Sequence, residues 1–268
     1  MFSVSTLQNQ AQTYNLNVQN TAVQVNLAGG ISSWTLNGIN ELNQQWFYYS
    51  VGGSPVNSID TISPWSSPTL GGQVVFGTLV NTNLTETYAN STLSVKTKYT
   101  LGENSSGATF GTAITLENLS STSQTFNFYQ YSHFGLGGSS SGQNAQFLGT
   151  ASPYEITQAG NGAFLTGTLT ALAGGSPGTT EEIAGVYNGT QFGLENGNAA
   201  PNFTDTSLSA TGNVDFGYEF TATLAPGTSL SISEIQSVPE PTSLALISAS
   251  LLSLGFVRKS ASRFSKKQ

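Results

Sequence analysis

Apolar and polar residues alternate along most of the chain with a period of two. Near the amino terminus, Tyr14, Leu16 and Val18 alternate with polar residues, and residues 22–27 repeat the pattern. Such alternation puts every second side chain on the same face of an extended strand. No window before Val238 shows the 3.6-residue period of an amphipathic helix. The pattern therefore predicts β-strands throughout this part of the chain.

Turn signals divide the alternating segments. The further predicted strands are 31–36, 42–49, 73–80, 83–88, 92–101, 109–117, 124–131, 145–148, 163–172, 182–187, 191–194, 215–224 and 229–235. Asn37-Gly38 and Asn161-Gly162 are dipeptides that favour tight hairpin turns. Roughly a dozen short strands with turns every 8–12 residues are typical of an antiparallel sandwich. We predict that residues 1–237 form one all-β domain, a large antiparallel β-sandwich.

Residues 238–268 have a different pattern. Val-Pro-Glu-Pro at 238–241 precedes an uncharged stretch, 242–257, and a tail containing Arg258, Lys259 and Arg263. As a helix, 242–257 would span about 24 Å, slightly less than a ~30 Å hydrocarbon core, and the basic side chains can reach the interface. The pattern predicts one C-terminal transmembrane helix with its basic end in the cytoplasm.

This order of features resembles the PEP-CTERM sorting signal of bacterial envelope proteins associated with exopolysaccharide. The matching residues are Pro239, Glu240 and Pro241, followed by Arg258, Lys259 and Arg263 as the basic end. The resemblance implies an exported protein of the cell envelope or extracellular matrix. It also implies an exosortase as partner, a membrane enzyme that cleaves near the Pro-Glu-Pro and releases or re-anchors its substrate. A plain C-terminal membrane anchor is the alternative.

Export also requires an amino-terminal signal. Such a signal has a basic start and an apolar run of ~7–15 residues. Residues 1–10 have neither, so we expect the signal to precede Met1.

Charge and composition narrow the classes of partner. Residues 1–240 contain all 14 acidic residues but, among the bases, Lys96 and Lys98 alone, which gives a net charge of −12. Such a body is repelled by phosphate backbones, which argues against nucleic-acid binding.

Charged residues are 8% of the chain, compared with ~25% in typical soluble domains. Uncharged polar residues and glycine take their place, as expected in an extracellular matrix. The absence of cysteine excludes disulfides, thiolate catalysis and Cys-zinc sites.

Aromatic residues supply the first candidate ligand contacts. Residues 46–49 read Trp-Phe-Tyr-Tyr, and Trp34 and Trp65 lie on either side in the sequence. Exposed rings can stack on apolar sugar faces. Consecutive residues of a strand point to opposite faces, so either some of these rings leave the core or a second layer covers the strand. Both interpretations stay open: a stacking platform that includes Trp46, Tyr48 and Trp65, or core packing.

The segment 125–138 suggests a fold. It resembles the part of galactose-mutarotase-like super-sandwich proteins that ends in a His-x-Tyr-Phe-Asn-Leu motif. Aligning Phe134 and Leu136 with this motif puts Tyr131 where the family has its catalytic histidine and His133 at the tyrosine position. The resemblance therefore implies the super-sandwich fold but argues against the reaction. Tyr131 and His133 are candidate ligand contacts.

The carboxylates offer no complete catalytic pair. Glu181 and Glu182 are adjacent, so on a strand they diverge. Asp215 and Glu219 share a strand face but lie ~13 Å apart along it. Asp205 with Asp215 could join a calcium site, because Ca²⁺ prefers oxygen ligands. No Ser-His-Asp order, phosphate-binding glycine loop or metal-binding histidine pair is present. We therefore predict neither a metal nor another cofactor.

These patterns together predict a non-enzymatic envelope or matrix protein that contacts exopolysaccharide. Residues 1–237 form its body, and residues 238–268 form a sorting signal that engages the membrane through 242–257. The alternative is a carbohydrate-active enzyme of the mutarotase-like super-sandwich type. Its site would depart from the family pattern and would combine Tyr131, His133 and an acid from elsewhere in the chain.

Overall fold

Two antiparallel β-sheets make up nearly all regular structure in the computed structural model, which describes residues 12–63, 66–75, 78–104, 107–148, 153–174, 180–188 and 209–239. The eight-stranded sheet A contains β1 (Thr13–Val18), β2 (Thr21–Asn26), β3 (Gly30–Leu36), β4 (Ile39–Val51), β5 (Asn57–Ser58), β10 (Gln124–Phe134), β14 (Thr180–Asn188) and β16 (Val214–Leu224). The nine-stranded sheet B contains β6 (Thr69–Val75), β7 (Thr78–Ala89), β8 (Leu93–Asn104), β9 (Gly107–Asn118), β11 (Gln143–Phe147), β12 (Tyr154–Gly160), β13 (Ala163–Gly174), β15 (Ser209–Gly212) and β17 (Ser229–Pro239). Within these ranges the helical segments are two short 3₁₀ turns, η1 (Ile59–Thr61) and η2 (Leu136–Gly138).

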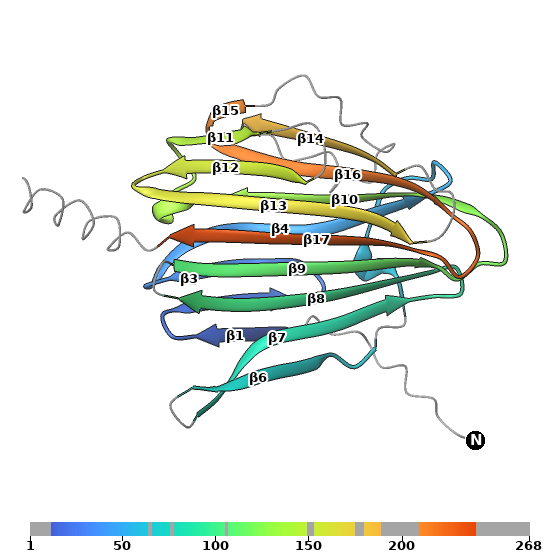
Figure 1. Ribbon diagram of the computed structural model, residues 1–268, viewed down its shortest axis with the longest axis horizontal. Coiled ribbons are helices and arrows are strands. Elements are labelled where there is room, and N and C mark those ends of the chain that lie inside the picture. Colours follow the sequence, from blue (N-terminus) through green and yellow to red (C-terminus); the bar gives the residue numbers. More distant parts are fainter. Residues whose placement is uncertain are drawn as a thin grey trace, which may run out of the picture.

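The sheets stack as two layers. Sheet A has the order β1-β2-β3-β4-β10-β16-β14, with β5 paired to β4, and sheet B has the order β15-β11-β12-β13-β17-β9-β8-β7-β6. Figure 1 shows sheet B in front of sheet A, with the strands of the two layers running in similar directions. Most neighbours are joined by hairpins, but β10 inserts between β4 and β16, and β17 inserts between β13 and β9. The predicted all-β antiparallel sandwich is confirmed.

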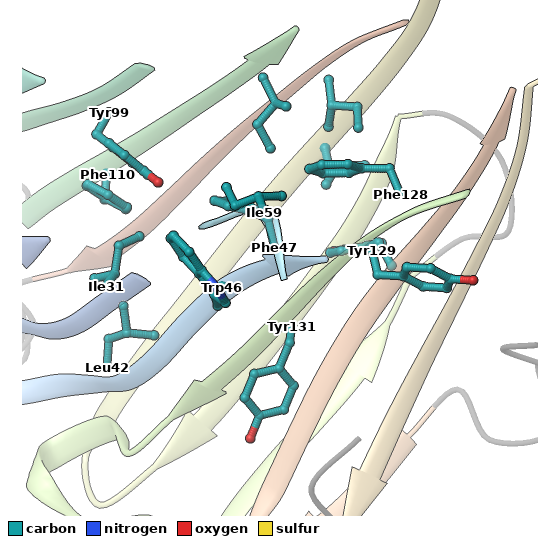
Figure 2. Packing of buried hydrophobic residues seen from close by; sticks show 14 of the residues in the cluster. Ile31, Leu42, Trp46, Phe47, Ile59, Tyr99, Phe110, Phe128, Tyr129 and Tyr131 are labelled. Carbon is teal, nitrogen blue, oxygen red and sulfur yellow. The ribbon is translucent and has the colours of Figure 1, made fainter. Parts of the chain in front are cut away.

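The core fills the space between the sheets. In β8 the buried side chains are Leu93, Val95, Thr97, Tyr99 and Leu101. Stacked rings join the strands, with centroids 5.9 Å apart for Phe47 and Phe128, 6.1 Å for Tyr99 and Phe110, and 5.7 Å for Phe134 and Phe216. Figure 2 shows part of this cluster, which includes Ile59 of η1 and Phe47 of β4. The period of two in the sequence therefore reflects one face packed against the opposite sheet.

Two predicted hairpin turns form as expected. Asn37 and Gly38 have φ values of 52° and 80°, and Asn161 and Gly162 have 51° and 81°. Two successive residues with positive φ make the type of turn that matches the twist of a tight hairpin. These turns connect β3 to β4 and β12 to β13.

Some strand predictions were wrong. Residues 154–160 form β12, which the sequence pattern did not predict. One of its buried positions is Gln158, and this polar residue interrupts the alternation of apolar side chains. The predicted strand 73–80 is divided, since β6 ends at Val75 and β7 begins at Thr78. Nearly all of β6 is exposed at the sheet edge, so its sequence carries little alternation. The predicted strand 191–194 lies outside the described residues.

The carboxyl-terminal part of the described chain is β17. Val238 is buried and pairs with Ala108, and Pro239 pairs with Gly107. Glu240, Pro241, the predicted helix 242–257 and the basic residues Arg258, Lys259 and Arg263 lie outside the described residues. Of the helices in the described ranges, none has the length and apolar character needed to cross a membrane.

Candidate functional site

Three neighbouring strands of sheet A bring several sequence candidates together. In β10, Tyr129, Tyr131 and His133 lie on the face opposite Phe128 and Gln130, because successive residues of a strand alternate. The register with β4 and β16 forms three cross-strand rows: Tyr48–Tyr129–Glu219, Trp46–Tyr131–Gly217 and Gln44–His133–Asp215. We call these three rows the β10 face.

His133 is the accessible polar group of β10 on this face. Its side chain is 21% exposed, whereas that of Asp215 is 4% exposed. The His133 Nε2 atom lies 2.8 Å from Oδ1 of Asn213 and 3.6 Å from Oδ1 of Asp215. The hydrogen bond to Asn213 orients the imidazole ring, and the partial exposure leaves the ring within reach of a ligand.

The two tyrosines of β10 are buried. Burial, and then the nearby charge of Glu219, raises the pKa of Tyr129 to about 12. The phenol of Tyr129 is therefore protonated at neutral pH and serves as a hydrogen-bond donor. Tyr131 is 4% exposed, and Figure 2 shows that its ring points away from the rings of Phe47 and Phe128.

A shallow hollow of about 280 Å³ adjoins the β10 face. Its lining residues are Ala28, Gly29, Gln44, Trp46, Tyr48, Ser58 and Asp60. The indole Nε1 of Trp46 donates a hydrogen bond of 2.6 Å to the hydroxyl of Ser58, which in turn donates to the carboxylate of Asp60. Gln44 belongs both to the hollow and to the row of His133. The hollow and the exposed imidazole are therefore neighbours.

The aromatic stretch of β4 is largely enclosed. Trp46 is 2% exposed and Tyr48 is 4% exposed, and the ring of Trp46 meets that of Tyr88 edge-on at 6.4 Å between centroids. This burial favours the core-packing interpretation over a stacking platform, although both residues contribute to the lining of the hollow. Trp65, the third aromatic candidate, lies outside the described residues.

The remaining acidic candidates are dispersed. Glu181 and Glu182 are consecutive residues of β14. Asp215 and Glu219 lie on β16 in rows separated by that of Tyr131. Asp205 lies outside the described residues. Among the side chains that the structure describes, no three His, Cys, Asp or Glu groups gather where they could hold a metal ion.

A polar cluster inside the sandwich was missed by the sequence analysis. Glu234 of β17 is buried, and its Oε2 accepts hydrogen bonds from Gln45 of β4, at 2.9 Å, and from Gln130 of β10, while Oε1 accepts from Gln236 at 3.1 Å. Burial raises the pKa of Glu234 to about 7, against the opposing effect of these three amide donors. The sequence does contain one indication of this cluster. Glu234 and Gln236 occupy positions of β17 at which the period of two predicts apolar residues.

A second buried acid lies in the same sheet. Glu86 of β7 is fully buried opposite Thr97 of β8, and burial raises the pKa of its carboxyl group to about 7. The interior of sheet B therefore contains two carboxyl groups that bind protons more tightly than exposed ones do.

Comparison with known proteins establishes the class of fold. The chain shares its fold with a bacterial glucoamylase complexed with acarbose, with a TM-score of 0.55, 10% identity, and coverage of 85% of this chain and 32% of that chain. It is also similar to a galactose mutarotase related enzyme from Lactobacillus acidophilus, with a TM-score of 0.51 and 7% identity. That match covers 86% of this chain and 98% of the enzyme. The chain thus spans about a third of the glucoamylase. The chain has a fold similar to that of the galactose mutarotase related enzyme, in agreement with the fold that the segment 125–138 indicated.

The sequence itself gives no closer relationship. Comparison with protein-family models and with curated proteins finds no match. At identities of 10% and 7% the structural likeness concerns the fold alone.

Proposed function

We propose that the protein is an exported, non-enzymatic envelope protein that binds a saccharide at the hollow beside the β10 face. The proposal is carried by one observation: the open hollow and the accessible imidazole of His133 meet at Gln44. The fold adds support, because the chain shares it with a glucoamylase complexed with acarbose and with a galactose mutarotase related enzyme.

The chemistry of this surface suits sugar hydroxyl groups. The amide of Gln44, the carboxylate of Asp60 and the imidazole of His133 offer both donors and acceptors. Trp46 and Tyr48 add aromatic surface to the lining. The volume of about 280 Å³ is near the lower end of the ~300–1,000 Å³ range of ligand pockets, which suits a short saccharide segment.

The arrangement of the acids supports binding rather than catalysis. Reaction at a sugar ring needs an acid and a base within hydrogen-bond reach of the reacting atoms. Tyr131 occupies the position that the resemblance assigns to the catalytic histidine, and its row on β16 contains Gly217 rather than an acid. Asp215 and Glu219 lie ~13 Å apart along one strand.

Binding is tested with the full-length chain and the extracellular polysaccharide of the producing strain, by isothermal titration calorimetry. Gln44→Ala and His133→Ala are expected to weaken binding at least tenfold. Gln146→Ala, which truncates an exposed glutamine of β11 in sheet B, is the matched control and should leave affinity unchanged. Equal binding by all four proteins would show that the ligand binds elsewhere, and no binding by the wild type would refute the proposal.

Catalysis is the second candidate function, and the contact of 3.6 Å between His133 and Asp215 favours it. The test is the rate at which the full-length chain interconverts sugar anomers, followed by NMR. A rate enhancement that His133→Ala abolishes would replace the non-enzymatic proposal with an enzymatic one.

The sorting signal completes the proposal. We expect an exosortase-type enzyme to process the chain near Pro239-Glu240-Pro241 while 242–257 engages the membrane and Arg258, Lys259 and Arg263 prevent full translocation. Its position supports this, because the last described strand, β17, ends at Pro239, where the motif begins. The measurement is the mass of the carboxyl terminus of the mature protein. Recovery of intact Gln268 on surface-located molecules would identify the segment as a plain anchor.

A further inference from the structure

The outer face of sheet B contains an open trough, on the side of the sandwich away from the β10 face. The trough has a volume of about 320 Å³ and runs over β8, β9 and β17. Its lining includes Lys98, Thr100, Gly111, Ala113, Ser233 and Ile235. These residues alternate along their strands with buried ones, so their side chains point outward.

Gly111 makes the floor of the trough. A Cβ atom added there would find its nearest neighbours, in Glu234 and Thr100, at 3.8 Å, which is an ordinary contact distance. Its backbone is not among those with positive φ. A glycine inside a strand costs ~0.5–1 kcal/mol relative to alanine. Since neither crowding nor backbone conformation requires this glycine, its effect is to leave room for a group that approaches the sheet from outside.

The flanks of the trough differ in chemistry. In register with Gly111 lie Thr100 on one side and Ile235 on the other, and Ile235 is 56% exposed. In the next row, Ala113 lies between Lys98 and Ser233. An extended molecule lying over Gly111 would therefore meet hydroxyl groups, one apolar side chain and a cation.

Two lysines on β8, at or near the trough, carry a charge opposite to that of the body. Lys96 and Lys98 are the two basic residues of the first 240, against 14 acids. Both are exposed and lie two positions apart on β8, so their side chains share the outer face about 7 Å apart. In the described part of the chain, no carboxylate forms an ion pair with either lysine. An anionic ligand would thus be repelled by most of the body and attracted here.

We propose that the trough binds a segment of an acidic polysaccharide whose sugars carry carboxylate groups. Lys96 and Lys98 contact the carboxylates, a sugar ring lies over Gly111, and Ile235 packs against its apolar edge. The proposal goes beyond the saccharide site of the β10 face, because it concerns a separate surface and stands whether or not the β10 face binds. A symmetric stack of two copies through this face would oppose lysine to lysine, which disfavours self-association.

The test uses the full-length chain and polygalacturonate as the probe, by calorimetry at low and high salt. Lys96→Gln/Lys98→Gln is expected to reduce affinity at least tenfold. Gly111→Val, which leaves the charge unchanged and fills the floor, should do the same while the melting temperature stays within a few degrees. High salt should weaken wild-type binding. Because residues 258–267 keep their five basic side chains in every variant, the loss measures the trough alone.

Two controls separate this proposal from its alternatives. His133→Ala changes the β10 face only and should bind polygalacturonate as the wild type does, and fully methyl-esterified polygalacturonate should bind at least tenfold more weakly. The proposal fails if neither trough variant lowers affinity, if His133→Ala lowers it equally, or if esterification has no effect. It also fails if Gly111→Val converts a dimer into a monomer in sedimentation, since the trough would then be a contact between copies.

Discussion

Three glutamine side chains surround the carboxyl group of Glu234 between the two sheets. Each uses its amide N–H to donate to the acid, and the side-chain oxygens of Gln45, Gln130 and Gln236 find no hydrogen-bond partner within the described residues. The donors come from β4, β10 and β17 itself, so the cluster fixes the position of one sheet against the other. Removing the carboxyl group of Glu234 would leave the three buried amides without their common acceptor, and a buried polar group that loses its partner costs about 1–3 kcal/mol.

The buried acid makes stability depend on pH. Because burial raises the pKa of Glu234 from 4.5 to about 7, the folded state binds this proton more tightly than the unfolded state does. The stabilisation is complete below pH 4.5 and is lost as pH rises through 7, with a total of about 3 kcal/mol. The wild type should therefore lose stability between pH 4 and pH 8.5, as measured by the free energy of urea unfolding. We expect this loss to be smaller by about 3 kcal/mol in Glu234→Gln.

The comparison between wild type and variant isolates Glu234. Glu86, whose pKa burial also raises to about 7, keeps its own contribution in both proteins. If the two proteins lost equal stability between pH 4 and pH 8.5, the carboxyl group of Glu234 would not titrate in this range.

Truncation of Trp46 tests its role in the core. Since Trp46 is 2% exposed, Trp46→Ala should lower the free energy of unfolding by ~3–5 kcal/mol, because it leaves a cavity. Val74→Ala is the control, because Val74 is 70% exposed and such surface changes are within about 0.5 kcal/mol. An unchanged melting temperature for Trp46→Ala would contradict the core-packing interpretation for this residue.

Single residues of the candidate site were only partly predictable. His133 is the one histidine of the chain, and its place in an aromatic segment singled it out. Its partner Asn213 is 80 positions away in the sequence, and the sequence suggests calcium, not a histidine, as the partner of Asp215. Such a pairing depends on β10 and β16 being neighbours in sheet A, for which the sequence contains no local signal.

At the scale of elements, two glycines are required for different reasons: Gly30, the first residue of β3, and Gly38, in the turn between β3 and β4. Gly30 and Gly38 have φ values of 85° and 80°. A Cβ on Gly30 would lie 2.3 Å from the backbone oxygen of Gln45 and 2.4 Å from the ring of Trp46, whereas nothing lies within 4 Å of one on Gly38. The start of β3 is thus held against β4 by a contact that only glycine permits.

A matched pair of substitutions separates the two requirements. Gly38→Ala should cost about 1–2 kcal/mol, which is the penalty of a left-handed residue. Gly30→Ala should cost several kcal/mol more, since a backbone atom must move as well. Chemical unfolding of both variants measures the difference. Similar costs for the two would show that the contact between Gly30 and β4 can relax freely.

The positions of the strands in the sequence were largely predictable, but the order of the strands within each sheet was not. The Asn-Gly turns define the hairpins β3–β4 and β12–β13, because turn and pairing are adjacent in the sequence. The insertion of β10 between β4 and β16 depends on packing between distant segments. Buried polar residues such as Gln158 and Glu234 also hid part of the pattern, because alternation is recognised through apolar side chains.

At the scale of the whole molecule, the last described strand lies inside sheet B. β17 pairs with β13 over residues 229–237 and with β9 over residues 229–239. Leu230, Ile232 and Val238 are buried in the core, in addition to Glu234. Without β17, both neighbouring strands would lose one side of their hydrogen bonding, and the sandwich would open between them.

Truncation after residue 228 should therefore abolish folding, whereas truncation after residue 241 should not. We expect the shorter chain to be insoluble or protease-sensitive and to lack a near-ultraviolet circular dichroism signal. The longer chain, which retains β17 but loses 242–268, is the control for removal of the carboxyl terminus. A shorter chain with the native spectrum would show that β9 and β13 close on each other without β17.

The place of β17 in sheet B also sets the timing of folding. β9 and β13 leave the ribosome long before the strand that separates them, and during this interval their facing edges are unpaired. Unpaired edges of this kind can capture strands of other chains. Pairings between segments so distant in sequence also form slowly. Until residue 239 has been made, association with other chains therefore competes with folding, and sheet B closes when β17, its last described strand, takes its place between β9 and β13.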